Sequence, residues 1–215
     1  GVPELLNLTK PEWLTEIHSA YVSAGSQLVY ANTFGANRYK LAETGKSVAE
    51  IIPAAIENAK NAVGDKALVA LDIGPIGQLL EPTGTLSFEE AYDIFREQIE
   101  AGREADVVVF ETMTDLYELK AAVLAAKENC DLPIICTMTF EQNMRTFTGC
   151  AISSMAITLE GLDVDAIGVN CSLGPRELEP VVAELSRWTT LPIVVKANAG
   201  LPDPVTNKYD VTPEG

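Results

Sequence analysis

The sequence has little positive charge: 15 Lys and Arg stand against 31 Asp and Glu in 215 residues, a formal net charge of −16. Nucleic acids and anionic membranes bind basic surfaces, so this balance argues against both as partners. No apolar run approaches the length that spans a bilayer, and the first residues, Gly1-Val2-Pro3-Glu4, do not resemble a signal peptide. We therefore expect a cytoplasmic protein.

Cysteine and histidine are also scarce. The cysteines are Cys130, Cys136, Cys150 and Cys171, without a CxxC pair. Scattered cysteines in a chain of this length suit a reducing compartment better than a disulfide framework. The single histidine, His18, lies inside a predicted helix, which argues against a Ser-His-Asp triad. No GxGxxG follows a predicted strand, so a dinucleotide site has no support.

The sequence does contain a regular alternation of short apolar segments and helical segments. Hydrophobic residues make up 47% of the chain, and no low-complexity or linker-like stretch interrupts it, so we expect a single domain over 1–215. The predicted strands are 28–31, 67–73, 107–110, 133–138, 166–169 and 192–196. The predicted helices are 11–24, 47–63, 87–104, 114–129, 153–159 and one that begins at Pro175. Residues 201–215 are expected to form a loop.

Strands that are apolar throughout are typical of a parallel sheet covered by helices, either an open doubly wound sheet or a (β/α)8 barrel. The barrel is favoured because nearly every predicted strand ends in polar residues, and a barrel collects all its strand ends at one site. These residues are Asn32, Thr33, Asp72, Glu111, Thr137, Asn170, Cys171 and Asn198. A closed barrel needs eight strands, so the prediction is an α/β TIM-type barrel whose first and last strands are missing from this chain.

The stretch from Ala166 to Pro175 is the most informative one. An apolar run ends at Asn170-Cys171, and a helix begins near Pro175. A thiol at the C-terminal end of a buried strand lies where α/β enzymes keep their chemistry. The alternative is a small buried hydrophobe, the usual role of a free cysteine. Cys136 and Cys150 are assigned to that structural role.

Six segments, taken in order, resemble the homocysteine S-methyltransferases, most closely their cobalamin-dependent methionine synthase branch. The segments are Asn32-Thr33-Phe34-Gly35-Ala36-Asn37, Asp72-Ile73-Gly74-Pro75, Phe110-Glu111-Thr112, Arg145-Thr146-Phe147-Thr148-Gly149, Gly168-Val169-Asn170-Cys171-Ser172-Leu173-Gly174-Pro175 and Asn198-Ala199-Gly200-Leu201-Pro202. The resemblance covers essentially the whole chain. It implies a homocysteine-binding barrel that transfers a methyl group to the homocysteine thiol and yields methionine.

The resemblance also implies a zinc ion held by three thiolates, with Cys171 as one ligand and the other two expected beyond residue 215. Glu111 is expected to bind the substrate ammonium group. Asn170, Thr33, Asp72 and Asn198 are the further expected substrate-binding residues. Cobalamin is implied only through another domain, so cobalamin- and folate-binding domains of a longer protein are the expected partners. With one thiolate, this chain alone is expected to be inactive.

Three alternatives remain open at this point. The methyl donor could be betaine or S-methylmethionine instead of methylcobalamin. The chain could be a non-catalytic barrel fragment without a complete zinc site. Lys196, near a predicted strand end, is placed where an aldolase-type barrel could carry a Schiff-base lysine.

Overall fold

The structure is a computed structural model that describes residues 1–200, 202–203, 205–209 and 211–212. In this part of the chain, six strands alternate with helices, and their order in the sheet follows the sequence. The strands are β1 (Leu28–Tyr30), β2 (Leu68–Ile73), β3 (Val107–Met113), β4 (Ile134–Met138), β5 (Ala166–Asn170) and β6 (Ile193–Lys196). Parallel strands in sequence order, separated by helices, are the repeating unit of a TIM-type barrel. The predicted fold class is confirmed.

Every predicted helix is present. The longer helices are α2 (Pro11–Ser23), α4 (Val48–Val63), α5 (Phe88–Ala101), α6 (Leu116–Asn129), α7 (Ile152–Gly161) and α8 (Pro175–Leu185). Among the described residues, no helix combines the length and the apolar character required to cross a bilayer. The predicted loop over 201–215 lies partly outside the described residues, which omit 201, 204, 210 and 213–215.

The sequence prediction missed four short helical segments. They are η1 (Pro3–Leu5), α1 (Leu6–Thr9), α3 (Arg38–Leu41) and η2 (Gly64–Lys66). Two of them, η1 and α1, precede the first predicted helix, which begins at Pro11. Segments of three or four residues are too short to show a helical period of apolar residues. The side chain of Asn37 stabilises α3, because it accepts hydrogen bonds from the backbone N–H groups of Tyr39 and Lys40.

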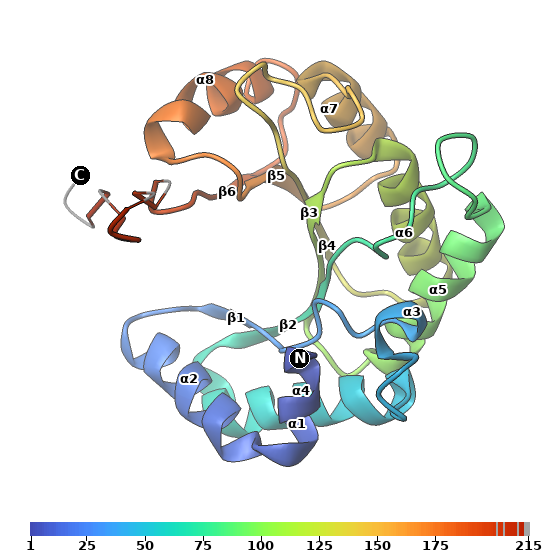
Figure 1. Cartoon of the computed structure of the whole chain (residues 1–215), viewed down its shortest axis with the longest axis vertical. Coiled ribbons are helices and arrows are strands. Elements are labelled where there is room, and N and C mark those ends of the chain that lie inside the picture. Colours follow the sequence, from blue (N-terminus) through green and yellow to red (C-terminus); the bar gives the residue numbers. More distant parts are fainter. Residues whose placement is uncertain (201, 204, 210, 213–215) are drawn as a thin grey trace. The chain divides into compact units, whose positions relative to one another are not determined.

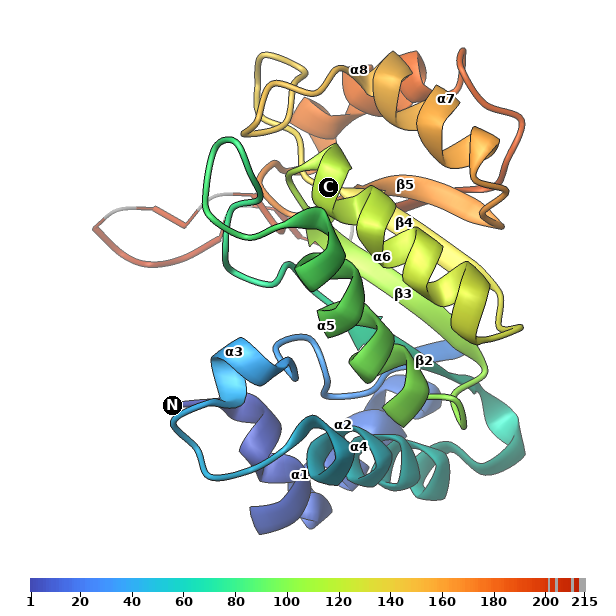
Figure 2. The same ribbon diagram turned by 90° about the vertical axis from the view of Figure 1, so that its right-hand side faces the viewer.

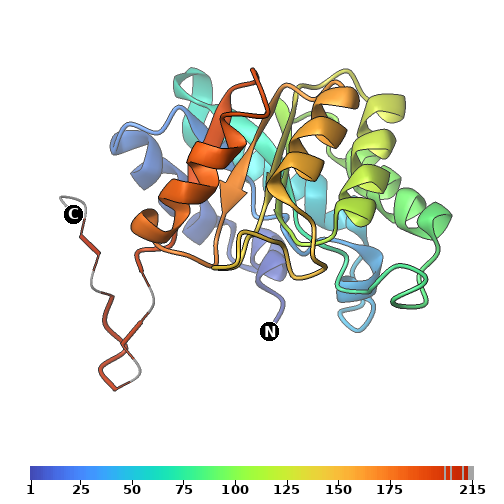
Figure 3. The same cartoon turned by 90° about the horizontal axis from the view of Figure 1, so that it is seen from above.

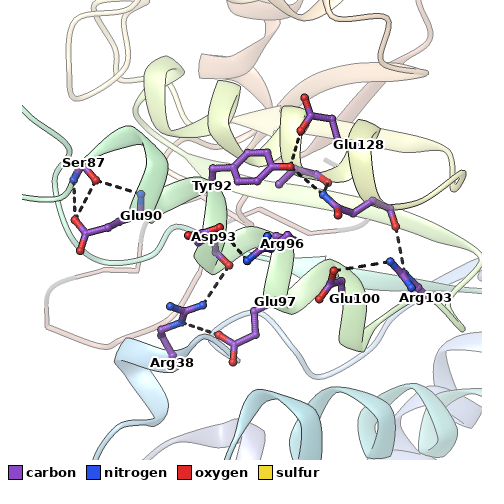
Figure 4. Close-up of polar contacts among 12 residues, drawn as sticks. Arg38, Ser87, Glu90, Tyr92, Asp93, Arg96, Glu97, Glu100, Arg103 and Glu128 are labelled. Atoms are coloured by element: carbon purple, nitrogen blue, oxygen red, sulfur yellow. Dashed lines mark hydrogen bonds and ion pairs between the residues drawn. The ribbon is translucent and has the colours of Figure 1, made fainter.

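The predicted capping box at the start of α5 is confirmed. The Glu90 N–H donates to Ser87 Oγ at 3.2 Å, and the Ser87 N–H donates to Glu90 Oε2 at 3.2 Å (Figure 4). The exposed side of the helix carries further polar contacts, including Arg38 with Glu97 at 2.7 Å. The helix ends at Ala101 rather than at residue 104, because Gly102 follows as its C-cap.

The chain divides into two compact units. The first comprises Gly1–Phe110 and Tyr117–Ile134, and the second comprises Glu111–Leu116 and Ile135–Gly215. In the first unit, β1 and β2 pair in parallel and α2 lies beside α4 (Figure 1). Its core is apolar, and the fully buried rings of Phe95 and Phe110 meet edge to face. The expectation of a single domain stays a prediction.

In the second unit, β5 is buried along its whole length and pairs in parallel with β4 on one side and with β6 on the other. Helices α7 and α8 lie side by side, with α8 against β5 (Figures 2 and 3). The β5–β6 register places Asn170 opposite Lys196, so the polar end of one strand lies beside the basic end of the next. This register brings the C-terminal ends of β5 and β6 side by side.

Gly168, in the middle of β5, is required by the close approach of β6. A Cβ at this position would lie 1.8 Å from the Val194 carbonyl oxygen, a contact that only a backbone shift relieves. Glycine weakens a strand unless a neighbouring backbone approaches closely, and here one does.

We predict that Gly168→Ala lowers the free energy of unfolding by about 1–3 kcal/mol, because the added methyl group forces β5 and β6 apart. Gly161→Ala is the matched control. A Cβ at Gly161 meets no atom within 4 Å, and alanine is the better helix former. Urea denaturation followed by circular dichroism measures both changes. Equal stability of the two variants would show that the close β5–β6 approach is not a constraint.

Candidate functional site

Three residues at strand ends of the second unit adopt left-handed backbone conformations that favour glycine. Thr112, at the end of β3, has φ 60°, and Cys171 and Ser172, directly after β5, have φ 60° and 61°. Such a conformation is a genuine outlier for a β-branched residue such as Thr112. Each costs about 1–3 kcal/mol and persists only where surrounding contacts impose it. Such residues cluster at functional sites, so this strain marks the strand ends as a candidate site.

The side chain of Asn170 supplies those surrounding contacts. Its Oδ1 accepts hydrogen bonds from the Thr112 N–H and from the Thr137 hydroxyl, each at 2.8 Å. Its Nδ2 donates to Thr112 Oγ1 at 2.8 Å and to Cys171 Sγ at 3.4 Å. The Thr112 N–H can only donate, so it fixes which end of the amide is the oxygen. One amide that is 2% exposed thus joins the ends of β3, β4 and β5.

The backbone around Cys171 is held on both sides. The Thr139 hydroxyl donates to the Asn170 carbonyl at 3.0 Å, and the Cys171 N–H donates to the Lys196 carbonyl at 3.1 Å. The Cys171 sulfur lies 3.8 Å from Thr112 Oγ1. Cys171 is also half-buried rather than fully buried, so it differs from a core cysteine.

Glu111 forms an ion pair in the same unit. Lys196 Nζ lies 2.6 Å from Glu111 Oε2, and the two side chains are 44% and 14% exposed. The carboxylate that the sequence assigns to a substrate ammonium group therefore already contacts an ammonium group of the protein. Lys196 is exposed and paired, unlike the desolvated lysine that forms a Schiff base.

The other predicted site residues fall into two groups. Asn198 belongs to the second unit, where its backbone N–H donates to the Leu173 carbonyl at 3.0 Å. Thr33 and Asp72 lie together in the first unit: the Thr33 hydroxyl donates to the Asp72 carbonyl at 2.7 Å and accepts from the Asp72 N–H at 3.1 Å. The Thr33 hydroxyl thus ties a loop to the end of β2. Substrate binding by these three residues stays a prediction.

The remaining cysteines and His18 are consistent with structural roles. Cys136 is fully buried within β4, as expected. Burial raises the pKa of the Cys150 thiol, which lowers its reactivity at neutral pH. His18 is buried on α2.

A zinc centre requires more ligands than these residues supply. Among the described residues, no group of three or more His, Cys, Asp or Glu side chains could hold a metal ion. Cys171 is a soft ligand with an amide donor on its sulfur, which suits a zinc thiolate. The described residues therefore supply one ligand of a three-thiolate zinc site and not the complete site.

The sequence analysis placed Thr137 at a strand end and Thr112 in a family segment but gave neither a contact with Asn170, and it considered Lys196 only as a Schiff-base alternative. A signal for two of the threonines was present: Thr137 and Thr139 are polar residues near the end of an otherwise apolar strand. They share one face because side chains alternate along a strand. The pairing of Lys196 with Glu111, 85 residues earlier, depends on strand register and left no local signal.

The chain is also similar to known proteins in sequence and in fold. Over residues 2–215 the chain matches the sequence model of a family described as homocysteine S-methyltransferase. It is 32% identical over 219 residues to proteins named methionine synthase from Mycobacterium leprae and from Mycobacterium tuberculosis. These alignments cover 94% of this chain and 18% of each relative, so the chain spans less than a fifth of their length.

Among solved structures, the chain resembles the metallated form of the homocysteine methyltransferase MmuM from Escherichia coli, with a TM-score of 0.76. The match covers 88% of this chain and 73% of that one at 22% identity. A likeness at this level of identity shows the fold.

We predict that Asn170→Ala lowers the free energy of unfolding by about 2 kcal/mol, because it leaves the half-buried Thr112 N–H and the buried Thr137 hydroxyl without their acceptor. Asn198→Ala is the control, since Asn198 makes its hydrogen bond through the backbone and alanine retains it. We expect the control to change stability by less than about 0.5 kcal/mol. Thermal and urea denaturation measure both. If the two variants lost equal stability, the Asn170 amide would not be what holds the strand ends.

Proposed function

Because the chain belongs to the homocysteine S-methyltransferase family, we propose that it binds homocysteine and serves the transfer of a methyl group to the homocysteine thiol, giving methionine. The observation that carries this proposal is the strand-end cluster of the second unit. There, the Asn170 amide holds the Cys171 sulfur, and the Glu111 carboxylate belongs to the same unit. Homocysteine has a thiol at one end and an ammonium group at the other. The Cys171 sulfur suits a metal that binds the thiol, and the Glu111 carboxylate suits the ammonium group.

The reaction needs the substrate sulfur as a thiolate, since the thiolate is the nucleophile and an ordinary thiol is mostly protonated at neutral pH. A zinc ion held at this site would supply the chemistry that keeps the substrate sulfur as a thiolate. We propose that Cys171 supplies one thiolate to such an ion and that the other two ligands lie outside the described residues. The donor set around Cys171 supports this role, as the preceding section describes.

Asn170 and Glu111 have separate tasks in this proposal. Asn170 fixes the direction of the Cys171 sulfur through its Nδ2 donor and through the Thr112 contacts that hold the left-handed backbone. Glu111 binds the ammonium group of homocysteine. The 2.6 Å contact between Glu111 and the Lys196 ammonium supports this task, because it shows that the carboxylate can accept an ammonium group.

We further propose that the methyl donor is methylcobalamin carried on another domain of a longer cytoplasmic protein, with a folate-binding domain as a further partner. The 32% identity to methionine synthases of more than five times this length supports that choice. Betaine and S-methylmethionine are the alternative donors, and a non-catalytic barrel is the alternative from another class. The chain alone, with one site thiolate, is proposed to be inactive.

We predict that Glu111→Gln weakens homocysteine binding about tenfold or more, because a charged hydrogen bond to the ammonium group is lost. Glu179→Gln, on the exposed side of α8, removes the same charge elsewhere in the second unit and is expected to leave the affinity unchanged. Isothermal titration calorimetry with homocysteine measures both. If the two variants bound homocysteine equally well, Glu111 would not be the ammonium site.

We predict that zinc binding depends on Cys171. In a polypeptide that extends this chain past residue 215, we expect about one zinc ion per chain, and we expect Cys171→Ser to remove it, because an open zinc site needs three protein ligands. Cys130→Ser, which changes a half-buried thiol at the end of α6, is expected to retain the metal. Elemental analysis of the purified proteins decides the question. Full zinc content in the Cys171→Ser protein would contradict the assignment.

A further inference from the structure

Lys196 is a charged residue of the strand-end cluster to which the proposed function gives no task. It ends β6, and its backbone carbonyl accepts the hydrogen bond from the Cys171 N–H at 3.1 Å. Its side chain reaches Glu111, which lies within β3, and places Nζ 2.6 Å from Oε2. The Lys196 backbone is thus held at Cys171, and the Lys196 ammonium group contacts the Glu111 carboxylate.

An ion pair at such exposure contributes little to stability. Partly exposed pairs are typically worth about 0–1 kcal/mol, since water screens them and two long side chains lose freedom. Stability is therefore a weak explanation for this pair. The two side chains also differ in exposure: Glu111 is largely covered at 14%, and Lys196 is exposed at 44% on a flexible four-carbon stem. Glu111 is thus the fixed member and Lys196 the movable one.

We propose that Lys196 is a specificity residue that binds the α-carboxylate of the substrate amino acid. The inference rests on the proposed function and adds the second half of substrate recognition. In the structure, the Lys196 ammonium contacts the Glu111 carboxylate. When an amino acid binds, its own ammonium replaces Lys196 at Glu111, and Lys196 turns to the substrate carboxylate.

The exchange is balanced in charge. A zwitterionic amino acid brings one ammonium and one carboxylate, so one internal ion pair becomes two pairs between protein and ligand, and the net charge of the cluster does not change. A ligand with only one of these groups replaces the internal pair by one new pair instead of two. The Glu111–Lys196 pair therefore selects α-amino acids over simple thiols, because the wrong ligand gains fewer contacts for the same broken pair.

The test compares three thiols of matched length. Homocysteine carries both charged groups, 3-mercaptopropylamine lacks the carboxylate, and 4-mercaptobutyrate lacks the ammonium. We expect Lys196→Met to weaken binding of homocysteine and 4-mercaptobutyrate about threefold to fivefold, the effect of losing one partly exposed charged contact. Binding of 3-mercaptopropylamine is expected to stay equal or to tighten, since Lys196 no longer competes for Glu111. Isothermal titration calorimetry on the 215-residue chain measures the affinities for all three thiols.

Two further variants separate recognition from folding. Lys196→Arg keeps the positive charge and is expected to restore selectivity for the carboxylate-bearing thiols. Lys208→Met removes an exposed lysine elsewhere in the second unit and is expected to change none of the three affinities. If Lys196→Met unfolds, Lys196→Gln with the same three ligands replaces it.

The outcomes distinguish this inference from the proposed function. If Lys196→Met weakens the binding of all three thiols equally, or of none of them, the role of Lys196 is overturned and the proposed function still stands. A folded wild-type chain that binds neither homocysteine nor its analogues overturns the proposed function, and the inference with it. Loss confined to the two carboxylate-bearing thiols supports both.

Discussion

The hydrogen bonds of the Asn170 side chain are the constraint on which the candidate site depends. A single buried amide uses its oxygen to hold β3 and β4 and its nitrogen to hold β3 and the Cys171 sulfur. Because the amide is buried, losing any partner leaves a polar group unsatisfied, and that cost is larger than the net gain of an ordinary hydrogen bond. The network therefore fixes the strand ends to one another more firmly than strand pairing alone.

This constraint explains how the strained backbone persists. Thr112 and Cys171 have positive φ angles that side chains normally avoid, and both contact the Asn170 amide. The left-handed turn at Cys171 begins directly where β5 ends, so the sulfur is presented at the strand end instead of continuing the alternation of the strand. Energy stored in the turn is offset by the amide contacts, and the result is a thiol with a defined direction.

The sequence predicts much of this architecture, and the reasons are local. Helix α5 was expected from its capping box, and β5 from an apolar run that ends in Asn170-Cys171. Local signals also explain the errors. Helix α3 is too short to show a helical period of apolar residues. Strand β3 runs three residues past its expected end, because the polar residues Glu111 and Thr112 still continue the strand to Met113.

The side-chain contacts of the site could not be predicted in the same way, because they depend on register. Thr137 meets Asn170 because β4 and β5 pair with Met138 opposite Val169. Lys196 lies beside Cys171 because β6 pairs with Asn170 opposite Lys196. A shift of one residue in either strand would turn these side chains to the other face. The residue types were visible in the sequence, but their partners depend on how the strands align.

The overall charge gives Lys196 a physical reason to be at this cluster. A chain with a formal charge of −16 repels anions, and an amino acid presents its carboxylate as an anion. Glu111 attracts the ammonium end of such a ligand and adds to the repulsion of the other end. A local positive charge is needed to reverse that field over the few ångströms that separate the two groups of a zwitterion. In the proposed recognition, Lys196 provides this charge, since it lies 2.6 Å from Glu111 and its carbonyl accepts from the Cys171 N–H. The same acidic composition that argues against nucleic acid as a partner thus gives this lysine its part in the proposed binding of an amino acid.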